Sequence, residues 1–357
     1  MLRSQPPLPP VLGSALPRRA FLGGAAAGAL ALSGIRTAGG EEAAAPFVPL
    51  SIPGKLVKVT RPNSLQPNGL WPDEDSARRM LERAMTELTG APDVGAAFAC
   101  FLRKDDRVAI KPNGIAAQVG ATMGSNKELV AEIVRGVVAA GVPPSNITIY
   151  EQFRSYLIGT RVVDRTLALD PAFPAGVKAT FHDNSDATAG VIHVCGVPTC
   201  YVRPFTEATA VINVSLIKDH SICGYTGALK NITHGSIINP GAFHDHHASP
   251  QIAELYAQAV VRSRVVLHVA DAFKLIYEGG PLDRNPERRL PHEAIYVSTD
   301  PVALDAVGWA EVDRLRRDKG LPSLKSAGRE PSYIRIAAEL GLGVADLDRI
   351  HVHEVRS

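Results

Sequence analysis

The feature that most constrains the fold of this chain is a regular alternation of short apolar runs with longer amphipathic stretches. The apolar runs lie at 107–110, 146–150, 177–183, 209–217, 264–270, 293–298 and 349–355. The amphipathic stretches lie at 126–141, 250–261, 301–320 and 331–343. Runs that are apolar throughout indicate strands buried on both faces, and helices between strands indicate parallel connections. We therefore predict an α/β three-layer sandwich with a mostly parallel central sheet, and some antiparallel strands in the middle segment, 177–203.

The first 45 residues have the pattern of an export signal. Arg18 and Arg19 precede Phe21, and an apolar run rich in Ala and Gly follows as far as Leu32. Paired arginines before such a run are typical of a twin-arginine signal peptide, and the run is too short for a membrane span. We predict a signal peptide and disordered leader over 1–45, recognised by the twin-arginine export machinery, and a single α/β domain over 46–357. The mature protein would then be periplasmic or extracellular. The alternative is a chance arginine pair in a disordered tail.

Composition and missing motifs exclude several classes of function. The formal net charge is only +2, and no run of basic residues longer than a pair occurs, so a nucleic-acid partner is not expected. Neither a Walker motif nor GxGxxG is present, and GxSxG is also absent, so no nucleotide or common serine-hydrolase motif is found. The four cysteines contain no CxxC pair. Cys195 and Cys200 flank a predicted hairpin, and two alternatives stay open for them, a disulfide and two buried thiols.

Charged residues follow five of the apolar runs. They are Lys111 with Asn113, then Glu151, then Lys218, Asp219 and His220, then Asp271, and last Asp300. In a parallel α/β sheet, ligands bind outside the carboxyl ends of the strands, so these residues are expected at one edge. Simpler interpretations exist for four of them, and for Lys111, which precedes Pro112, Asn113 and Gly114, it is a plain turn flank. Asp300 precedes Pro301 and fits a helix N-cap, Asp271 fits a turn, and Glu151 fits a solvated loop.

Two lysines are the strongest sign of an anionic ligand. Lys218 and Lys230 each stand beside a long apolar run, where an ammonium group needs an anionic partner. Gly224 and Gly227 precede Lys230 in a turn whose backbone N–H groups would hold a phosphate or carboxylate. The predicted set that binds a small anionic molecule is Lys111, Asn113, Lys218, Lys230 and Asn231. The predicted acid–base set is Asp219, His220 and Asp271.

A histidine cluster suggests a metal. The segment FHDHHAS contains His244, Asp245, His246 and His247, and His234 lies ten residues upstream. Imidazole and carboxylate groups together suit zinc, iron or copper, so a divalent transition metal, zinc or iron, is a candidate cofactor. The spacing is not HExxH. Two alternatives stay open, a solvated His-rich loop and a single histidine that serves as general acid or base.

Four motifs in order carry a family resemblance. They are VAIKPNG (108–114), VINVSLIKDHSICGYTGALKNITHGS (211–236), VADAFKLIYEGGP (269–281) and STDPVALDAVGWAEVDRLR (298–316). Together they resemble the family catalogued as domain of unknown function 362, over about 107–312. The resemblance implies an association with iron–sulfur proteins through a cysteine-rich ferredoxin-type module. That module is absent here, so an iron–sulfur cluster held by this chain alone is not expected. The family's patterned positions fall on Lys111, Asn113, Lys218, Asp219, Lys230, Asn231, Asp271, Gly280, Asp300, Pro301 and Asp305.

Three functional hypotheses follow. The first is an exported enzyme, hydrolytic or redox, with an anionic-ligand site and a metal at the carboxyl edge of the sheet. The second is a non-catalytic metal or cofactor carrier that works with a redox partner in the cell envelope. The third is an anion-binding receptor, which would need two lobes and a hinge, and no linker in the sequence suggests one.

Overall fold

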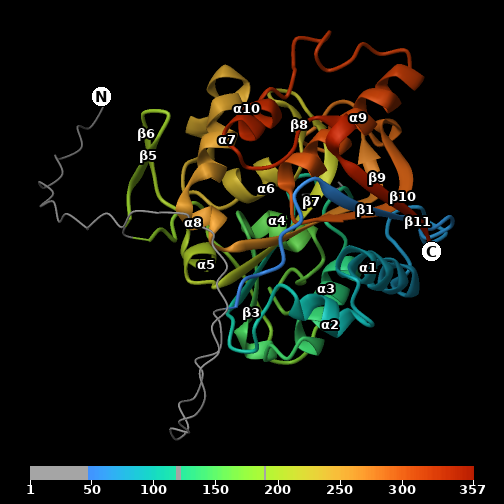
Figure 1. Ribbon diagram of the computed structural model, residues 1–357, viewed down its shortest axis with the longest axis vertical. Helices are drawn as coiled ribbons and strands as arrows, with labels where there is room; N and C mark the ends of the chain where they lie inside the picture. The colour runs from blue at the N-terminus through green and yellow to red at the C-terminus, as the bar shows by residue number, and fades with distance from the viewer. Residues whose placement is uncertain (1–46, 118–121, 189) are drawn as a thin grey trace, which may run out of the picture. The chain divides into compact units, whose positions relative to one another are not determined.

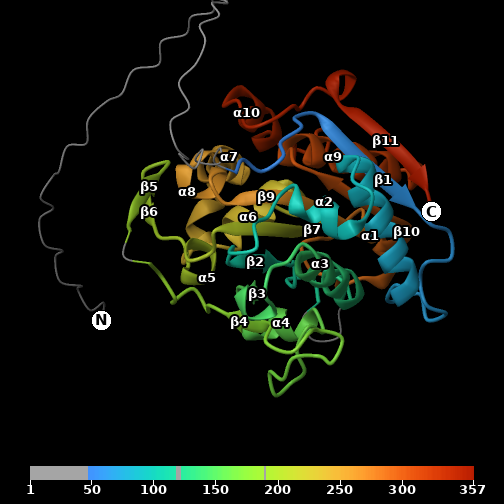
Figure 2. The same ribbon diagram turned by 60° about the horizontal axis from the view of Figure 1, so that its bottom comes forward.

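A nine-stranded sheet with helices on both faces forms the body of the chain (Figures 1 and 2). The structure is a computed structural model and describes residues 47–117, 122–188 and 190–357. The predicted signal peptide and leader, 1–45, lie outside these residues. Within the described residues, no helix combines the length and apolar character that a membrane span requires. Residues 47–357 form one compact unit.

The elements have the following bounds. The strands are β1 Lys55–Thr60, β2 Val108–Lys111, β3 Ile147–Glu151, β4 Lys178–Phe181, β5 Ile192–Val194, β6 Val197–Thr199, β7 Ala210–His220, β8 Gly224–Thr226, β9 Val265–Ile276, β10 Arg289–Ser298 and β11 His351–Arg356. The helices are α1 Glu74–Thr89, α2 Val94–Ala99, α3 Lys127–Ala139, α4 Arg154–Gly159, α5 Arg203–Thr206, α6 Ala228–His234, α7 Ser249–Ala257, α8 Ala259–Arg262, α9 Pro301–Asp318 and α10 Tyr333–Glu339.

The sheet is mixed and mostly parallel, which confirms the predicted fold class. Its order is β11-β1-β10-β9-β7-β2-β3-β4, with β8 paired to β7. The strands β4, β3, β2, β7 and β9 run parallel to one another. Antiparallel pairing joins β10 to both β9 and β1, and β8 to β7. In the middle segment, the separate β5–β6 hairpin and the isolated bridge between Ala187 and Val202 are antiparallel, whereas β4 joins the sheet in parallel.

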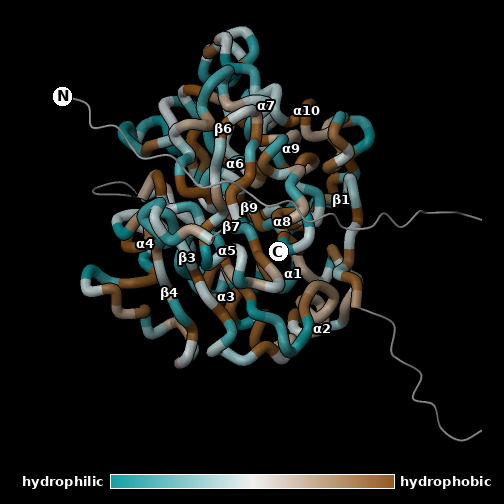
Figure 3. The backbone as a smooth tube through the Cα atoms, turned by 90° about the vertical axis from the view of Figure 1, so that its left-hand side faces the viewer, coloured by the Kyte–Doolittle hydropathy of each residue, from teal (hydrophilic) through white to brown (hydrophobic). Residues whose placement is uncertain are grey.

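Two apolar cores cover the two faces of the sheet. One core packs α1, α2 and α3 against alternate residues of the strands, such as Ile212 and Val214 of β7. The other packs α6, α7, α9 and α10 against the remaining alternate residues, such as Val211 of β7. Because successive side chains of a strand point to opposite faces, β7 must be apolar on both sides. Figure 3 shows hydrophobic segments near β7 and β9 in the interior.

The chain contains local signals for several helix ends. Asp300 accepts hydrogen bonds from the backbone N–H groups of Val302 and Ala303, and Pro301 occupies the first position of α9. This confirms the N-cap interpretation of Asp300. Asp73 caps α1 in the same way, and Gly90 ends that helix with φ of 75°, a conformation that glycine adopts without strain.

The two cysteines of the hairpin do not face each other. The β5–β6 pairing matches Val194 with Val197, so Cys195 lies in the tight turn and is exposed, while Cys200 is buried beyond the hairpin. All four cysteines are free thiols. The disulfide alternative is therefore wrong for this structure, and the buried-thiol alternative holds for Cys200 alone. The hairpin loop between β5 and β6 has two residues, Cys195 and Gly196, whereas a disulfide required a four-residue loop between Cys195 and Cys200.

Candidate functional site

The candidate site is a cavity of about 400 Å³ at the carboxyl ends of β2, β3 and β7. These three strands lie side by side and run parallel, so their last residues meet at one edge (Figure 2). Polar lining residues from the predicted set are Lys111, Asn113, Glu151, His220, Lys230, Asn231, His234 and His244. The edge predicted from the strand-end residues therefore does form a cavity.

Lys111 is a buried lysine with a carboxylate partner. Its Nζ donates to Glu151 Oε1 at 2.7 Å and to the carbonyl of Pro112 at 2.7 Å. The second interpretation of Glu151, a solvated loop residue, is wrong, because Glu151 ends β3 and only 2% of it is exposed. Burial lowers the pKa of Lys111, and the Glu151 charge opposes that change. The charge of Lys111 is therefore already balanced inside the protein.

Lys218 is buried with no carboxylate in contact among the described residues. It is completely inaccessible, and its Nζ donates to Asn113 Oδ1 at 2.9 Å. Burial, together with the neighbouring charge of Lys230, lowers its pKa to about 7. Lys218 itself does not line the cavity, but the Asn113 amide that it contacts does.

Lys230 reaches the cavity from α6. Its Nζ lies 3.3 Å from His244 Nε2, and no carboxylate of the described residues contacts it. His244 Nδ1 lies 2.9 Å from the carbonyl of Pro240, so Nδ1 carries the proton and Nε2 accepts from Lys230. Burial lowers the pKa of Lys230. The ammonium groups of Lys218 and Lys230 thus stand near each other without an anion.

A chain of buried amides supports the cationic residues from behind. Asn113 Nδ2 donates to Asn231 Oδ1 at 3.0 Å, and Asn231 Nδ2 donates to Asn213 Oδ1 at 2.7 Å. Asn213 Nδ2 then lies 3.0 Å from His268 Nδ1. An amide nitrogen only donates hydrogen bonds. Because Asn113 Nδ2 donates to Asn231 and Asn231 Nδ2 donates to Asn213, the amide oxygen of Asn113 is left to accept from Lys218. Sequence analysis missed Asn213 and His268, although each is a polar residue inside an otherwise apolar strand.

The imidazole of His220 turns one nitrogen toward the cavity. Its Nδ1 accepts from the backbone N–H groups of Ile222 and Cys223, at 3.1 and 3.4 Å. The proton of the neutral ring is therefore on Nε2. Burial and the nearby lysine charges lower the pKa of His220, which keeps the ring neutral. His220 is thus a hydrogen-bond donor among the lining residues, and its acid–base role stays a prediction.

The predicted metal set is not brought together. The ring centroids of His234 and His244 lie 5.0 Å apart, but Asp245, His246 and His247 are exposed. His234 Nε2 is engaged with the carbonyl of Phe243 at 3.0 Å. Across residues 47–117, 122–188 and 190–357, no group of three His, Cys, Asp or Glu side chains is placed to hold a metal ion. Zinc or iron binding stays a prediction, and we assign none of these side chains as a ligand.

Asp219 lies outside the cavity and serves as an ion-pair partner. Arg329 Nη1 donates to Asp219 Oδ1 at 2.7 Å, Arg316 Nη1 lies 3.8 Å from the same oxygen, and Gly280 N–H donates to Oδ2. The prediction ended the strand at residue 217, whereas β7 continues to His220. Side chains alternate along a strand, so Lys218 and His220 share one face and Asp219 takes the other.

Asp271 also lies outside the cavity. It lies within β9, which continues to Ile276, and it holds the start of α3 by accepting from Asn126 N–H and Nδ2. Burial raises the pKa of Asp271 to about 6. The structure therefore places two of the three predicted acid–base residues in supporting positions and only His220 in the cavity.

The turn before Lys230 is not an open anion cradle. The Asp305 carboxylate accepts the N–H groups of Ala228 and Leu229 at the first turn of α6. Gly227 allows this approach, because a Cβ there would lie 2.1 Å from Asp305 Oδ1. The prediction that free backbone N–H groups bind a ligand is therefore wrong. The anion bound at this turn is the protein's own carboxylate, Asp305 of α9.

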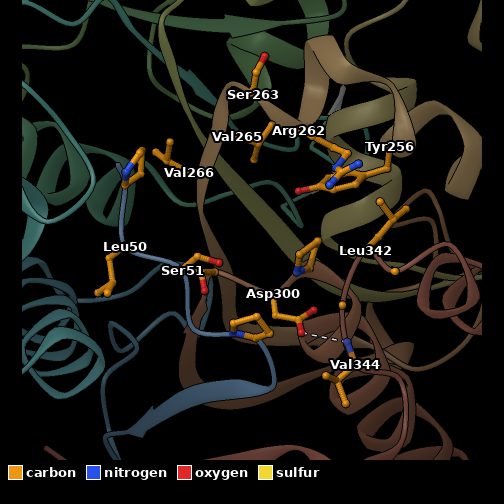
Figure 4. A pocket seen from close by; sticks show the side chains of 16 residues that line it. Leu50, Ser51, Tyr256, Arg262, Ser263, Val265, Val266, Asp300, Leu342 and Val344 are labelled. Atoms are coloured by element: carbon orange, nitrogen blue, oxygen red, sulfur yellow. Dashed lines mark hydrogen bonds between the residues drawn. The ribbon is translucent and has the colours of Figure 1, made fainter. Parts of the chain in front are cut away.

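A second cavity, of about 580 Å³, lies among residues from α7, α8, the start of β9, the start of α9 and the segments around Leu50 and Leu342 (Figure 4). Asp300 lines it and accepts from Val344 N–H at 3.0 Å, the contact that is dashed in the figure. Asp300 was predicted at the same edge as Lys218. Because β10 runs antiparallel to β9, its carboxyl end lies at the opposite edge of the sheet.

Several lining residues were not predicted. Phe153 and Tyr156 pack edge to face at 5.0 Å, and Ile115 and Ile222 line the same cavity. Thr226 also lines it, and its buried hydroxyl has no hydrogen-bond partner among the described residues. The cavity thus joins a cationic end to an apolar and aromatic part. Phe153 and Tyr156 follow Glu151 closely in sequence, and that was the available signal.

Comparison with known proteins agrees with the motifs. The family model described as "Domain of unknown function (DUF362)" matches residues 108–310, which is more than half of the chain. No curated protein matches the chain. The matched range contains β2, β7, α6 and β9, so it spans the lysines, the amide chain and most of the cavity. The chain belongs to the domain of unknown function 362 family.

Proposed function

We propose that this protein is an enzyme that binds a small organic anion in the cavity at the carboxyl ends of β2, β3 and β7. One observation carries the proposal: Lys218 and Lys230 are both buried at this edge, and neither contacts a carboxylate among the described residues. An ammonium group removed from water without an anionic partner is strongly destabilised. A bound anion would compensate both charges, so the site is complete only with a ligand.

The charge balance supports an anion over a neutral ligand. Lys111, Lys218 and Lys230 bring three ammonium groups to this edge, and Glu151 is the carboxylate that the cavity lining contributes. His220, His234 and His244 are held neutral, since burial lowers the pKa of each ring. A carboxylate or phosphate near Lys230 would meet an excess of positive charge in a region of low dielectric.

The other lining residues support an organic ligand and a reaction. Phe153, Tyr156, Ile115 and Ile222 offer an apolar surface suited to a carbon skeleton. His220 presents its Nε2 proton to the same space, within the reach of a ligand held by Lys230. Hydrogen-bond donation from a neutral imidazole stabilises negative charge that develops on oxygen. We assign anion binding to Lys230 and Lys218, and donation to the reacting group to His220.

Anion titrations test the proposal. Wild-type protein is titrated with benzoate, phenyl phosphate and inorganic phosphate by calorimetry. We expect saturable binding of at least one of these anions, weakened roughly 10- to 100-fold in Lys230→Met, because a hydrogen bond to a charged group contributes about 1.5–3 kcal/mol. Lys325→Met is the matched control, because the side chain of that lysine is 71% exposed and does not line the cavity. Equal affinities in all three proteins, or no binding at all, would refute the site.

The affinity should also depend on pH. The ammonium form of Lys218 is the form that attracts the anion, and burial lowers its pKa to about 7. Below pH 7 the group is charged before the ligand arrives, and above pH 7 ligand binding must include proton uptake. We therefore expect the affinity to fall up to about tenfold for each pH unit above 7. Calorimetry in two buffers of different ionisation enthalpy measures the proton uptake. An affinity that stays constant between pH 6 and 9 would contradict the prediction.

A further inference from the structure

The lining of the cavity places an amine, a base and a proton donor around one space. Lys230 Nζ lies 3.3 Å from the unprotonated Nε2 of His244, whose Nδ1 is engaged with the Pro240 carbonyl. The ring of His220 stacks on that of His244, with ring centroids 6.0 Å apart, and its Nε2 carries the proton. No carboxylate of the described residues holds Lys230 as an ammonium group. An amine beside an unprotonated ring nitrogen can lose its proton, so this arrangement suits a chemical step as well as the binding of an anion.

We propose that Lys230 is a nucleophile that forms an imine with an anionic aldehyde or ketone, such as a 2-oxo acid. The inference rests on the proposed anion site and names its substrate class. The ligand's carboxylate would be attracted by the charge of Lys218, and its carbonyl carbon would face the Lys230 amine. Covalent catalysis by lysine is favoured by desolvation of the amine and by a base beside it, and Lys230 is buried with His244 Nε2 at 3.3 Å.

The step balances with the residues present. The Lys230 ammonium gives one proton to His244 Nε2, and the free amine attacks the carbonyl carbon, whose oxygen accepts a hydrogen bond from His220. A proton passes from nitrogen to that oxygen and gives a carbinolamine. Protonated His244 returns its proton to the hydroxyl group, the C–O bond breaks, and water leaves. The product is a protonated imine, so the net charge of the site is unchanged: it rests on His244 in the intermediates and returns to the Lys230 nitrogen at the end, and no oxidant or reductant takes part.

The other two lysines do not fit this role. Lys111 is held by Glu151 at 2.7 Å, and Lys218 does not line the cavity. Lys230 alone combines a position on the lining with a neighbouring base. The nucleophile is therefore predicted to be a single residue, which makes the test specific.

Reductive trapping tests the inference. Folded protein is incubated with pyruvate, 2-oxoglutarate or 4-carboxybenzaldehyde and sodium cyanoborohydride, and adducts are located by peptide mass spectrometry. We expect one saturable adduct on the peptide containing Lys230. Lys230→Arg keeps the positive charge but has no nucleophilic amine, so it should lose the adduct, and competition by benzoate or phenyl phosphate is measured on the wild-type protein. Lys325→Arg is the matched control and should be labelled like the wild type.

The outcomes separate the two proposals. Anion binding without a Lys230 adduct, or labelling spread over surface lysines alone, overturns the imine and leaves the anion site in place. Absence of both anion binding and the adduct overturns the two together. An adduct that benzoate competes away supports both. Because the wild-type protein decides the main result, a poorly folded variant does not leave the inference untested.

Discussion

Replacing Asp219 with alanine is expected to lower the free energy of unfolding by about 3–5 kcal/mol, one of the two largest effects predicted for this chain. Asp219 is buried and receives Arg329 at 2.7 Å, with Arg316 at 3.8 Å from the same oxygen. The side chain of Arg316 is only 2% exposed, so alanine would leave a buried guanidinium group without its carboxylate. The Gly280 N–H would also lose its acceptor.

Urea unfolding of the wild type and of Asp219→Ala measures this effect. Asp318→Ala is the control, because Asp318 pairs with Arg314 on the exposed side of α9 and such pairs contribute at most about 1 kcal/mol. Anion affinity, measured where both proteins remain folded, should change little, since Asp219 lies outside the cavity. A stable variant that has lost the ligand would restore the acid–base role predicted from sequence and refute the ion-pair role.

The fold and the position of the site could be predicted because they depend on strand order and helix spacing. Five apolar runs end in charged residues, and parallel pairing of β2, β3 and β7 does bring Lys111, Glu151 and His220 to one edge. The errors in the predicted positions of Asp219, Asp271 and Asp300 came from the lengths and directions of the strands. β7 and β9 continue beyond the predicted ends, which turns Asp219 to the opposite face and leaves Asp271 inside a strand. Antiparallel β10 carries Asp300 to the opposite edge.

The partners of the site residues could not be predicted from sequence spacing. Asp305 reaches the first turn of α6 from 76 residues away, and Arg329 reaches Asp219 from 110 residues away. Both contacts depend on how α9 and the segment after it pack on the sheet. The exposure of most of the histidine cluster has a related reason, and metal binding there stays a prediction. Three successive polar residues in a loop, Asp245 to His247, remain in water when no buried surface pulls them inward.

Lys218→Met is expected to change the pH dependence of stability, because it removes a buried ammonium group. The folded-state pKa of Lys218 is about 7, whereas a lysine in the unfolded chain titrates near 10.4. Between these values the unfolded chain binds one more proton than the folded protein, so the free energy of unfolding rises with pH in this window. Below about pH 7 both states are protonated, and the full cost of burying the charge is present. From pH 9.5 to pH 6 the wild type should therefore lose about 3–4 kcal/mol that the methionine variant keeps.

Urea unfolding of both proteins at pH 6 and pH 9.5 measures this difference, and comparing the two pH values removes constant terms. The lost hydrogen bond to Asn113 weakens the variant at both pH values, so it cancels. Lys325→Met, at an exposed position, should show no such pH term. A saturating anion should restore wild-type stability at pH 6, because the ligand supplies the negative charge that no carboxylate of the described residues places beside Lys218 and Lys230. If the stability of the variant relative to the wild type is the same at both pH values, Lys218 carries no buried uncompensated charge, and the main support for an anion site at this edge is lost.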